Sequence, residues 1–133
     1  MLRAAKLEHR KGILFIGYAE GDLGLGHTFR NDLLAAAHTK LPFAIYPFNV
    51  GIETRRIGAF MPERYDRTHA YDGNIIEVAP DYIPKVLGSV DPRITYYTYN
   101  VLRTYWELPR APQAWRQMLK GIDEIWAPTR FVG

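Results

Sequence analysis

Short apolar runs alternate with amphipathic stretches along this chain, and the alternation predicts its architecture. The apolar runs are typical of buried strands and lie at Ile13–Ile16, Phe43–Phe48, Asp72–Ala79, Arg93–Tyr99 and Ile122–Ala127. Helical spacing of apolar residues predicts helices at about Gly26–Thr39, Tyr82–Gly88 and Gln113–Lys120. Strands that alternate with helices favour a parallel sheet with crossover connections. We therefore predict an α/β fold, a Rossmann-like, doubly wound parallel sheet of about five strands with helices on both faces.

The connection between the first strand and the first helix is a candidate binding loop. It is rich in glycine, and Gly24 and Gly26 allow the backbone to turn tightly and to approach a ligand closely. Ligands of doubly wound sheets bind beyond the carboxyl ends of the strands, often at this first loop. We expect free N–H groups near Thr28–Arg30, at the helix N-terminus, to suit a phosphate or another anion. A tight turn with no ligand is the alternative role for the two glycines.

The later connections show less regular patterning. Asn49–Tyr71 has no clean periodicity, and so long a connection in a compact domain is usually functional or mobile. Asn100–Pro112, with two prolines, is expected to be a loop. Thr129 has the chemistry of a helix N-cap only four residues before Gly133, so we expect the chain to be one piece of a longer polypeptide.

Length and composition exclude several classes of protein. The 133 residues correspond to a single domain (1–133), and the 47% hydrophobic share is typical of a soluble globular protein. No apolar run approaches the roughly 20 residues of a transmembrane helix, and residues 1–11 do not form a signal peptide, so we expect a cytoplasmic location. The chain has no cysteine, which excludes thiolate metal sites, and we predict neither a metal nor a cofactor. The net charge of +3 is scattered, which argues against nucleic-acid binding.

Three segments together resemble the N-terminal half of a GT-B glycosyltransferase, closest to the retaining family-4 type. Gly17–His27 (GYAEGDLGLGH) is similar to the family's G-Y-x-x-x-x-G-L-G loop. Tyr71–Leu87 (YDGNIIEVAPDYIPKVL) is similar to its D-x-N-L-I-x-V-x-x-D-x-x-P strand and helix. The most specific segment is Tyr99–Val132, which resembles Y-N-I-x-Y-W-x-W-E-L-x-x-x-P-x-x-W followed by D-E-V-W-x-P-S-x-F-V.

The resemblance implies the acceptor-binding half of a retaining enzyme that transfers a sugar from a nucleotide-sugar donor to a glycan or other acceptor. In that family the donor site lies mostly in a second Rossmann-like domain with an E-x7-E type motif, and no such motif follows here. We therefore expect the isolated chain not to transfer sugar. We also expect self-association through the face that would meet the second domain, because aromatic and apolar groups are frequent in it.

The resemblance also implies roles for individual residues. The implied acceptor or substrate site consists of Gly24, Gly26, His27, Trp106, Glu107 and Arg130. Trp106 offers a face for stacking on a sugar ring, and Glu107 offers a carboxylate for sugar hydroxyls. Packing of Trp106 on Trp115 and capping by Glu107 are the structural alternatives, and no catalytic residue is assigned.

Two residues depart from the family pattern near the expected acceptor pocket. Thr104 stands where the pattern often has its first tryptophan, and His27 stands where an acidic residue is common. The imidazole of His27 can donate a hydrogen bond to a phosphate or to a sugar hydroxyl. These departures leave the identity of the acceptor open.

Two other classes of function compete with the transferase hypothesis. A nucleotide-binding oxidoreductase domain would also use a glycine loop, but it needs an acidic residue at the end of the second strand to bind a ribose. Here that strand ends in Pro47, Phe48 and Asn49. A non-catalytic α/β module that docks another protein through its aromatic surface is the second alternative.

Overall fold

A computed structural model describes residues 7–22, 24–50, 56–96, 98–104 and 119–126 of the chain. The strands in this part are β1 (His9–Gly17), β2 (Phe43–Pro47), β3 (Ala70–Glu77), β4 (Tyr99–Arg103) and β5 (Glu124–Trp126). The α-helices are α1 (Gly24–Ala37), α2 (Ile83–Ser89) and α3 (Pro92–Thr95), and two 3₁₀ turns lie at η1 (Pro62–Arg64) and η2 (Pro80–Tyr82).

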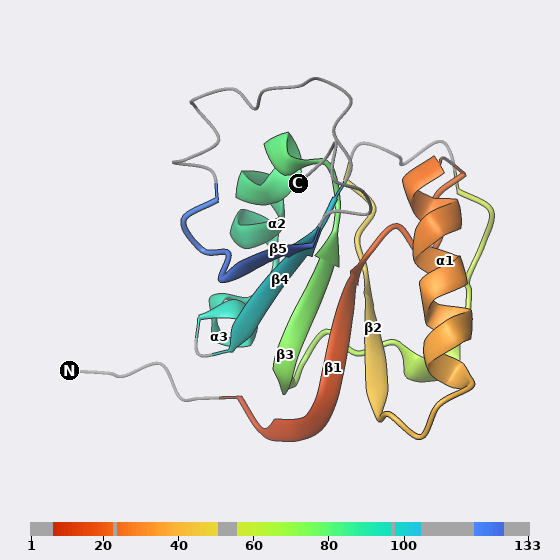
Figure 1. Cartoon of the computed structure of the whole chain (residues 1–133), viewed down its shortest axis with the longest axis horizontal. Helices are drawn as coiled ribbons and strands as arrows, with labels where there is room; N and C mark the ends of the chain where they lie inside the picture. Colours follow the sequence, from red (N-terminus) through yellow and green to blue (C-terminus); the bar gives the residue numbers. More distant parts are fainter. Residues whose placement is uncertain (1–6, 23, 51–55, 97, 105–118, 127–133) are drawn as a thin grey trace.

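The five strands form one sheet in the order β2-β1-β3-β4-β5, and every neighbouring pair is parallel (Figure 1). The register places Ile13 of β1 between Phe43 of β2 and Gly73 of β3. At the carboxyl end of the sheet, Gly17 lies between Pro47 and Glu77. The predicted Rossmann-like α/β fold is confirmed, including the parallel pairing of the first and third strands.

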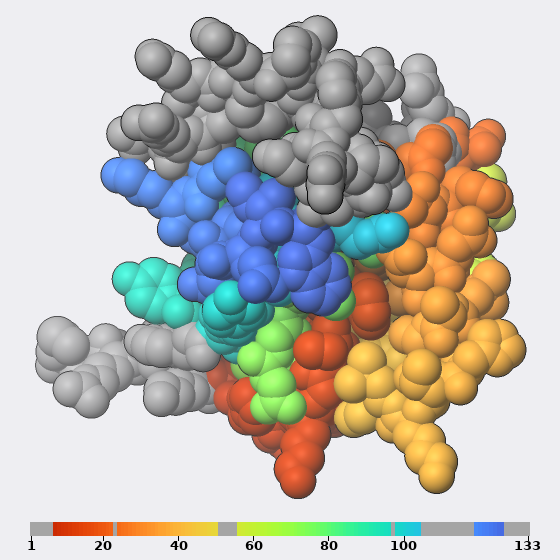
Figure 2. All heavy atoms as spheres, in the orientation of Figure 1, coloured from red at the N-terminus to blue at the C-terminus, as the bar shows by residue number. Residues whose placement is uncertain are grey.

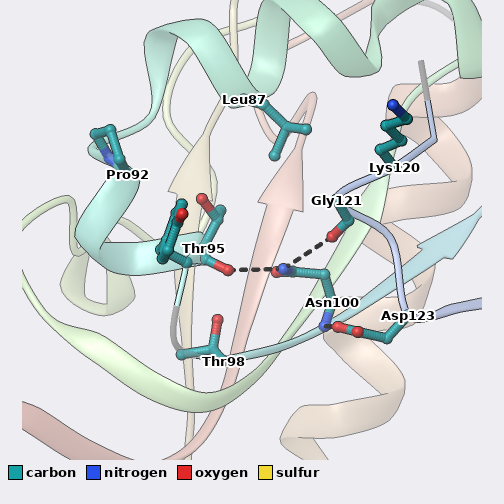
Figure 3. A pocket seen from close by; sticks show the side chains of 9 residues that line it. Leu87, Pro92, Thr95, Thr98, Asn100, Lys120, Gly121 and Asp123 are labelled. Carbon is teal, nitrogen blue, oxygen red and sulfur yellow. Dashed lines mark hydrogen bonds between the residues drawn. The ribbon is translucent and has the colours of Figure 1, made fainter. Parts of the chain in front are cut away.

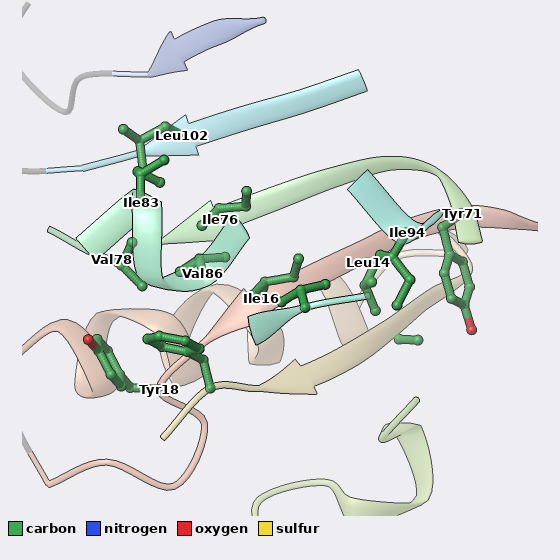
Figure 4. Close-up of a cluster of buried hydrophobic side chains, with 13 residues drawn as sticks. Leu14, Ile16, Tyr18, Tyr71, Ile76, Val78, Ile83, Val86, Ile94 and Leu102 are labelled. Atoms are coloured by element: carbon green, nitrogen blue, oxygen red, sulfur yellow. The ribbon is translucent and has the colours of Figure 1, made fainter. Parts of the chain in front are cut away.

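The two faces of the sheet carry separate apolar layers. On one face, α1 packs Phe29 and Leu33 against side chains of β1 and β2, and the Phe15 ring meets the Phe29 and Phe43 rings edge to face at 6.3 and 5.6 Å. On the other face, α2 and α3 contribute side chains to a larger buried cluster (Figure 4). Its most completely buried members are Leu14, Ile16, Ile76, Val78, Ile83, Val86, Ile94 and Leu102. Helices therefore cover both faces, as predicted.

The predicted fourth strand at Arg93–Tyr99 is wrong. The chain forms α3 there, because the Asp91 side chain accepts a hydrogen bond from the Arg93 N–H at 2.9 Å and Pro92 stands at the first helical position. The fourth strand is β4, which begins at Tyr99 and continues into the segment predicted to be a loop at Asn100–Pro112. A buried asparagine near the start of that strand interrupts the apolar run from which a strand would have been predicted.

Part of the long connection after β2 lies along the outer edge of that strand. Ile45 forms an isolated parallel bridge with Tyr65, and its carbonyl accepts the Asp66 N–H at 2.9 Å. The Arg64 guanidinium donates to the Phe43 carbonyl at 3.1 Å and lies 3.8 Å from the centre of the Phe43 ring. These contacts protect an edge strand that would otherwise present unpaired backbone groups.

Large side chains reach the surface near β5. Figure 2 shows α1 at one side of this face of the molecule and the β5 segment at the surface beside it. Tyr99, Ile125 and Trp126 are each about half exposed. Among the described residues, no helix has the length and apolar character needed to cross a membrane. The predicted helix at Gln113–Lys120 lies almost entirely outside the described residues, and the N-cap at Thr129 lies wholly outside them.

Candidate functional site at the carboxyl edge of the sheet

The order of the strands places a topological switch point at the carboxyl ends of β1 and β3. The strand order reverses at β1, which has β2 on one side and β3 on the other. The chain leaves β1 toward α1 on one face and leaves β3 toward α2 on the opposite face (Figure 1). Doubly wound sheets bind their ligands at such a switch point. The candidate site is therefore built from the segments that come directly after these two strands.

The loop after β1 is folded back onto the first turns of α1. An Arg30 guanidinium nitrogen donates to the carbonyl oxygen of Gly21 at 2.6 Å. A β-carbon at Gly26 would lie only 2.4 Å from that same oxygen and 3.0 Å from the oxygen of Tyr18. Gly26 is therefore required for close packing between the helix and the loop, and no ligand contact is needed to explain it.

Gly24 differs from Gly26 in its surroundings. A β-carbon built on Gly24 would meet no described atom within 4 Å, and the residue is exposed at the beginning of α1. Because the helix begins at Gly24, the free N–H groups of its first turn belong to residues 24–27 and not, as expected, to Thr28–Arg30. The exposed His27 lies in this same turn. Gly24 and His27 thus lie together at the open side of the loop.

A hydrogen-bonded cluster joins the ends of β1 and β2. The Glu20 carboxylate accepts from the Tyr65 hydroxyl at 3.1 Å and from the Asn49 amide nitrogen at 3.3 Å. Burial raises the pKa of Tyr65, which keeps its hydroxyl a donor at neutral pH, and the Phe60 N–H donates to the same oxygen at 2.9 Å. Asn49 Oδ1 is buried and has no hydrogen-bond partner among the described residues. These hydrogen bonds hold the loop after β1 against the residues that come after β2. The sequence did not predict this cluster.

A buried charge network lies at the ends of β3 and β4. The Arg103 guanidinium donates to Glu77 Oε1 at 3.1 Å and to the Asp32 carboxylate, which projects from α1. Glu77 is 1% exposed, and its Oε2 has no partner in the described part of the chain. Burial, together with the hydrogen bond and negative charge of Asp32, raises the pKa of Glu77 to about 8, and the opposing charge of Arg103 compensates only in part. At neutral pH Glu77 therefore carries a proton in a large fraction of molecules.

The residues predicted for the acceptor site fall into two groups. Gly24, Gly26 and His27 lie together at the carboxyl edge. Trp106, Glu107 and Arg130 lie outside the described residues, so their predicted roles stay predictions. Thr104, which departs from the family pattern, is 4% exposed and donates to the Val78 carbonyl at 3.1 Å. It ties β4 to the end of β3, and its hydroxyl is used in that contact.

A second polar cluster lies at the opposite, amino-terminal edge of the sheet. Asp66 accepts from the Tyr71 hydroxyl at 2.6 Å and the Thr68 N–H at 2.9 Å, and His69 Nδ1 lies 3.0 Å from its carboxylate. These hydrogen bonds outweigh the effect of burial and lower the pKa of Asp66 to about 2, whereas burial and Asp66 raise the pKa of Tyr71 to about 12. Thr68 and Asp66 both contact the same nitrogen of His69. The other imidazole nitrogen, Nε2, lies 3.5 Å from a carboxylate oxygen of Glu8, so the ring joins Asp66 to Glu8. This cluster lies at the edge of the sheet that faces away from the switch point.

A pocket of about 500 Å³ lies near the amino end of β4 (Figure 3). Asn100 occupies its centre and donates to the carbonyls of Thr95 at 2.8 Å and Gly121 at 3.2 Å, while its own N–H donates to Asp123 at 2.7 Å. These groups hold the turn before β5 against α3. Their hydrogen-bonding capacity is used internally, and they lie at the edge of the sheet that faces away from the switch point.

Within the described ranges, no three His, Cys, Asp or Glu side chains gather in a way that would hold a metal ion. Comparisons with models of protein families, with curated proteins and with solved structures gave no match. A function for this chain therefore has to be inferred from the geometry of the carboxyl edge and from the family resemblance of its three segments.

Proposed function

We propose that this chain is the acceptor-binding, N-terminal half of a retaining GT-B glycosyltransferase, located in the cytoplasm. Such an enzyme moves a sugar from a nucleotide-sugar donor to a glycan or other acceptor. The proposal has two supports: the three sequence segments that resemble the family, and the parallel sheet whose first loop opens at the switch point. The observation that carries most weight is the exposed turn at Gly24 and His27, at the beginning of α1.

The open turn suits a sugar acceptor in a simple chemical way. The space beside Gly24 lets a ligand approach the helix backbone, and N–H groups of the first turn donate to oxygen atoms. His27 adds an exposed side chain that can donate to or accept from a hydroxyl. We propose Trp106 as the stacking surface and Glu107 as the carboxylate that completes the acceptor site, with Arg130 facing the same cleft.

Sugar transfer also requires donors that stabilise the charge of the departing nucleoside diphosphate. We propose that a second Rossmann-like domain supplies these groups. On this proposal the described residues position the acceptor hydroxyl and do not themselves activate the donor.

An oxidoreductase domain is a weaker proposal for this site. No acidic residue ends β2, where a ribose would be bound, since Pro47, Phe48 and Asn49 occupy that place. Gly26 is packed against loop carbonyls and leaves no room there for a pyrophosphate. Binding of NADH, measured by fluorescence titration, would reverse this ranking. A protein-docking module is tested by association with a second polypeptide in the absence of sugar.

Substitution of the two proposed acceptor residues tests the function. Glu107→Gln should weaken the binding of mono- and disaccharides by about tenfold or more, because a hydrogen bond to a charged group contributes about 1.5–3 kcal/mol. Trp106→Ala should also weaken it, because it removes the stacking surface. Tyr96→Ala and Glu63→Gln are the controls, since both change exposed side chains away from the carboxyl edge after β3 and β4. A fall in melting temperature with unchanged sugar binding in the folded protein would end the assignment.

A transfer assay tests the division of labour between domains. The purified chain, incubated with radiolabelled nucleotide sugars and acceptors, should give no transfer above background hydrolysis. Transfer by the chain alone would show that the donor-activating groups lie within it.

A further inference from the structure

A pocket with a concentration of positive charge lies along the end of β2. It has a volume of about 280 Å³ and is lined by Tyr46, Pro47, Phe48, Asn49, Val50, Arg56, Arg67 and Ser89. Among the lining residues that the structure describes, two are charged, and both of these are arginines. The volume lies near the lower limit for small-molecule sites and accommodates a phosphate group with one small ring.

The two guanidinium groups are available to a ligand. Arg67 is exposed, and the hydrogen bond the structure gives it, to the Pro47 carbonyl at 3.3 Å, uses one of its five N–H donors. Arg56 is also exposed, and neither arginine forms an ion pair with a described residue.

The backbone and the neighbouring side chains hold these arginines in place. Arg56 forms an isolated antiparallel bridge with Gly21, which fixes it beside the loop that comes after β1. The Arg67 guanidinium carbon lies 5.6 Å from the centre of the Tyr46 ring, within the range of a cation–π contact. The nearest acids are already engaged: Glu20 with Tyr65 and Asn49, and Asp66 at the amino-terminal edge.

We propose that Arg56 and Arg67 form a binding site for a phosphate group at the carboxyl end of β2. Two guanidinium groups without a carboxylate favour a dianion over a monoanion, and each can form paired N–H···O hydrogen bonds to phosphate. Asn49 lines the same pocket, and its buried, unpartnered Oδ1 would accept a hydrogen bond from a hydroxyl of the same ligand. The site favours a phosphorylated, hydroxylated small molecule such as a sugar phosphate. It rests on the geometry of this pocket and does not require the transferase proposal to be correct.

The test is a titration of the whole chain, followed by the backbone amide signals of its ¹⁵N–¹H spectrum. The probes are inorganic phosphate, glucose 6-phosphate, glucose and acetate at constant ionic strength. We expect saturable shifts at residues 46, 48–50, 56 and 67 with both phosphates, and none at these residues with glucose or acetate at the same concentration. Tighter binding of glucose 6-phosphate than of phosphate identifies a sugar phosphate as the ligand, whereas equal binding identifies the phosphate group alone.

Variants separate this site from general attraction of anions to a basic surface. Arg56→Gln and Arg67→Gln should each weaken phosphate binding by about tenfold. Arg67→Lys keeps the charge but loses the paired N–H donors of the guanidinium group, so it should have an intermediate effect. Lys40→Gln removes the same charge from an exposed position after α1 and should leave binding unchanged. Equal binding by all four variants, or shifts spread over the whole surface, would overturn the proposal. Failure of sugar binding in the Trp106 and Glu107 experiments would leave it intact.

Discussion

Replacement of Glu77 by glutamine provides a quantitative test of the buried charge network at the ends of β3 and β4. The carboxyl is 1% exposed and shares the single positive charge of Arg103 with Asp32, and its pKa is raised to about 8. In the unfolded chain the ordinary pKa of 4.5 applies. Between pH 4.5 and pH 8, Glu77 is therefore protonated in the folded protein and ionised in the unfolded chain.

The sign and size of the effect follow from this difference. Stability associated with Glu77 is fully present below pH 4.5 and is lost as the pH rises through 8. The difference in pKa corresponds to at most about 5 kcal/mol, and because Asp32 and Glu77 interact, we expect a loss of about 2–4 kcal/mol. Glutamine has the shape of the protonated side chain and retains a donor and an acceptor. The Glu77→Gln variant should therefore lack this pH dependence of the free energy of unfolding.

Urea unfolding of both proteins at pH 5 and pH 9 measures the effect directly. The free energy of unfolding of the Glu77→Gln variant should equal or fall below that of the parent at pH 5. At pH 9 the variant should be the more stable of the two. Glu63→Gln, the same change at an exposed site, should behave as the parent does at both pH values. An equal difference between variant and parent at pH 5 and pH 9 would show that Glu77 is ionised throughout and would refute the reasoning.

Two further predictions concern the packing of the loop and the cluster at the opposite edge. Gly26→Ala should lower the free energy of unfolding by about 2 kcal/mol or more because its β-carbon would meet the Gly21 carbonyl, whereas Gly24→Ala, in open space, should be neutral or slightly stabilising in the same urea assay. Asp66→Asn should lower the free energy of unfolding by about 1–2 kcal/mol at pH 7. Because the pKa of Asp66 is about 2 in the folded protein and 3.8 ordinarily, the parent should lose its greater stability over the variant as the pH falls from 4 through 2. Equal effects at the two glycines, or an unchanged acid transition for Asp66→Asn, would contradict these two accounts.

The architecture could be predicted where apolar runs coincide with strands. The run at Ile13–Ile16 lies in β1, a central parallel strand that is buried on both faces and consists largely of apolar residues there. The run at Phe43–Phe48 contains β2, an edge strand whose residues are nevertheless almost all buried. The run at Asp72–Ala79 overlaps β3 in the same way. The β-branched and aromatic residues of Arg93–Tyr99 misled the prediction, although Asp91 and Pro92 are a helix-start signal that could have corrected it.

The site was less accessible to prediction from sequence than the fold. The glycine loop was predicted from local spacing, and His27 from the family resemblance of the same segment. The contacts of Glu20 with Tyr65 and of Arg103 with Asp32 join residues 45 and 71 positions apart. No local pattern predicts such pairs, because the parallel sheet brings distant strand ends to one edge only after folding. The polar residues Glu77 and Thr104 are buried there for the same reason.

The most direct test of the central claim is a map of where sugars bind on the folded chain. The ¹⁵N–¹H spectrum would be titrated with glucose, N-acetylglucosamine and maltose, with NADH as a comparison ligand. The account predicts saturable shifts with at least one of these sugars, concentrated at residues 24–27 and at residues 78–79 after β3. Shifts from the sugars confined to the amino-terminal edge around Asn100, or shifts at the carboxyl edge with NADH alone, would contradict it.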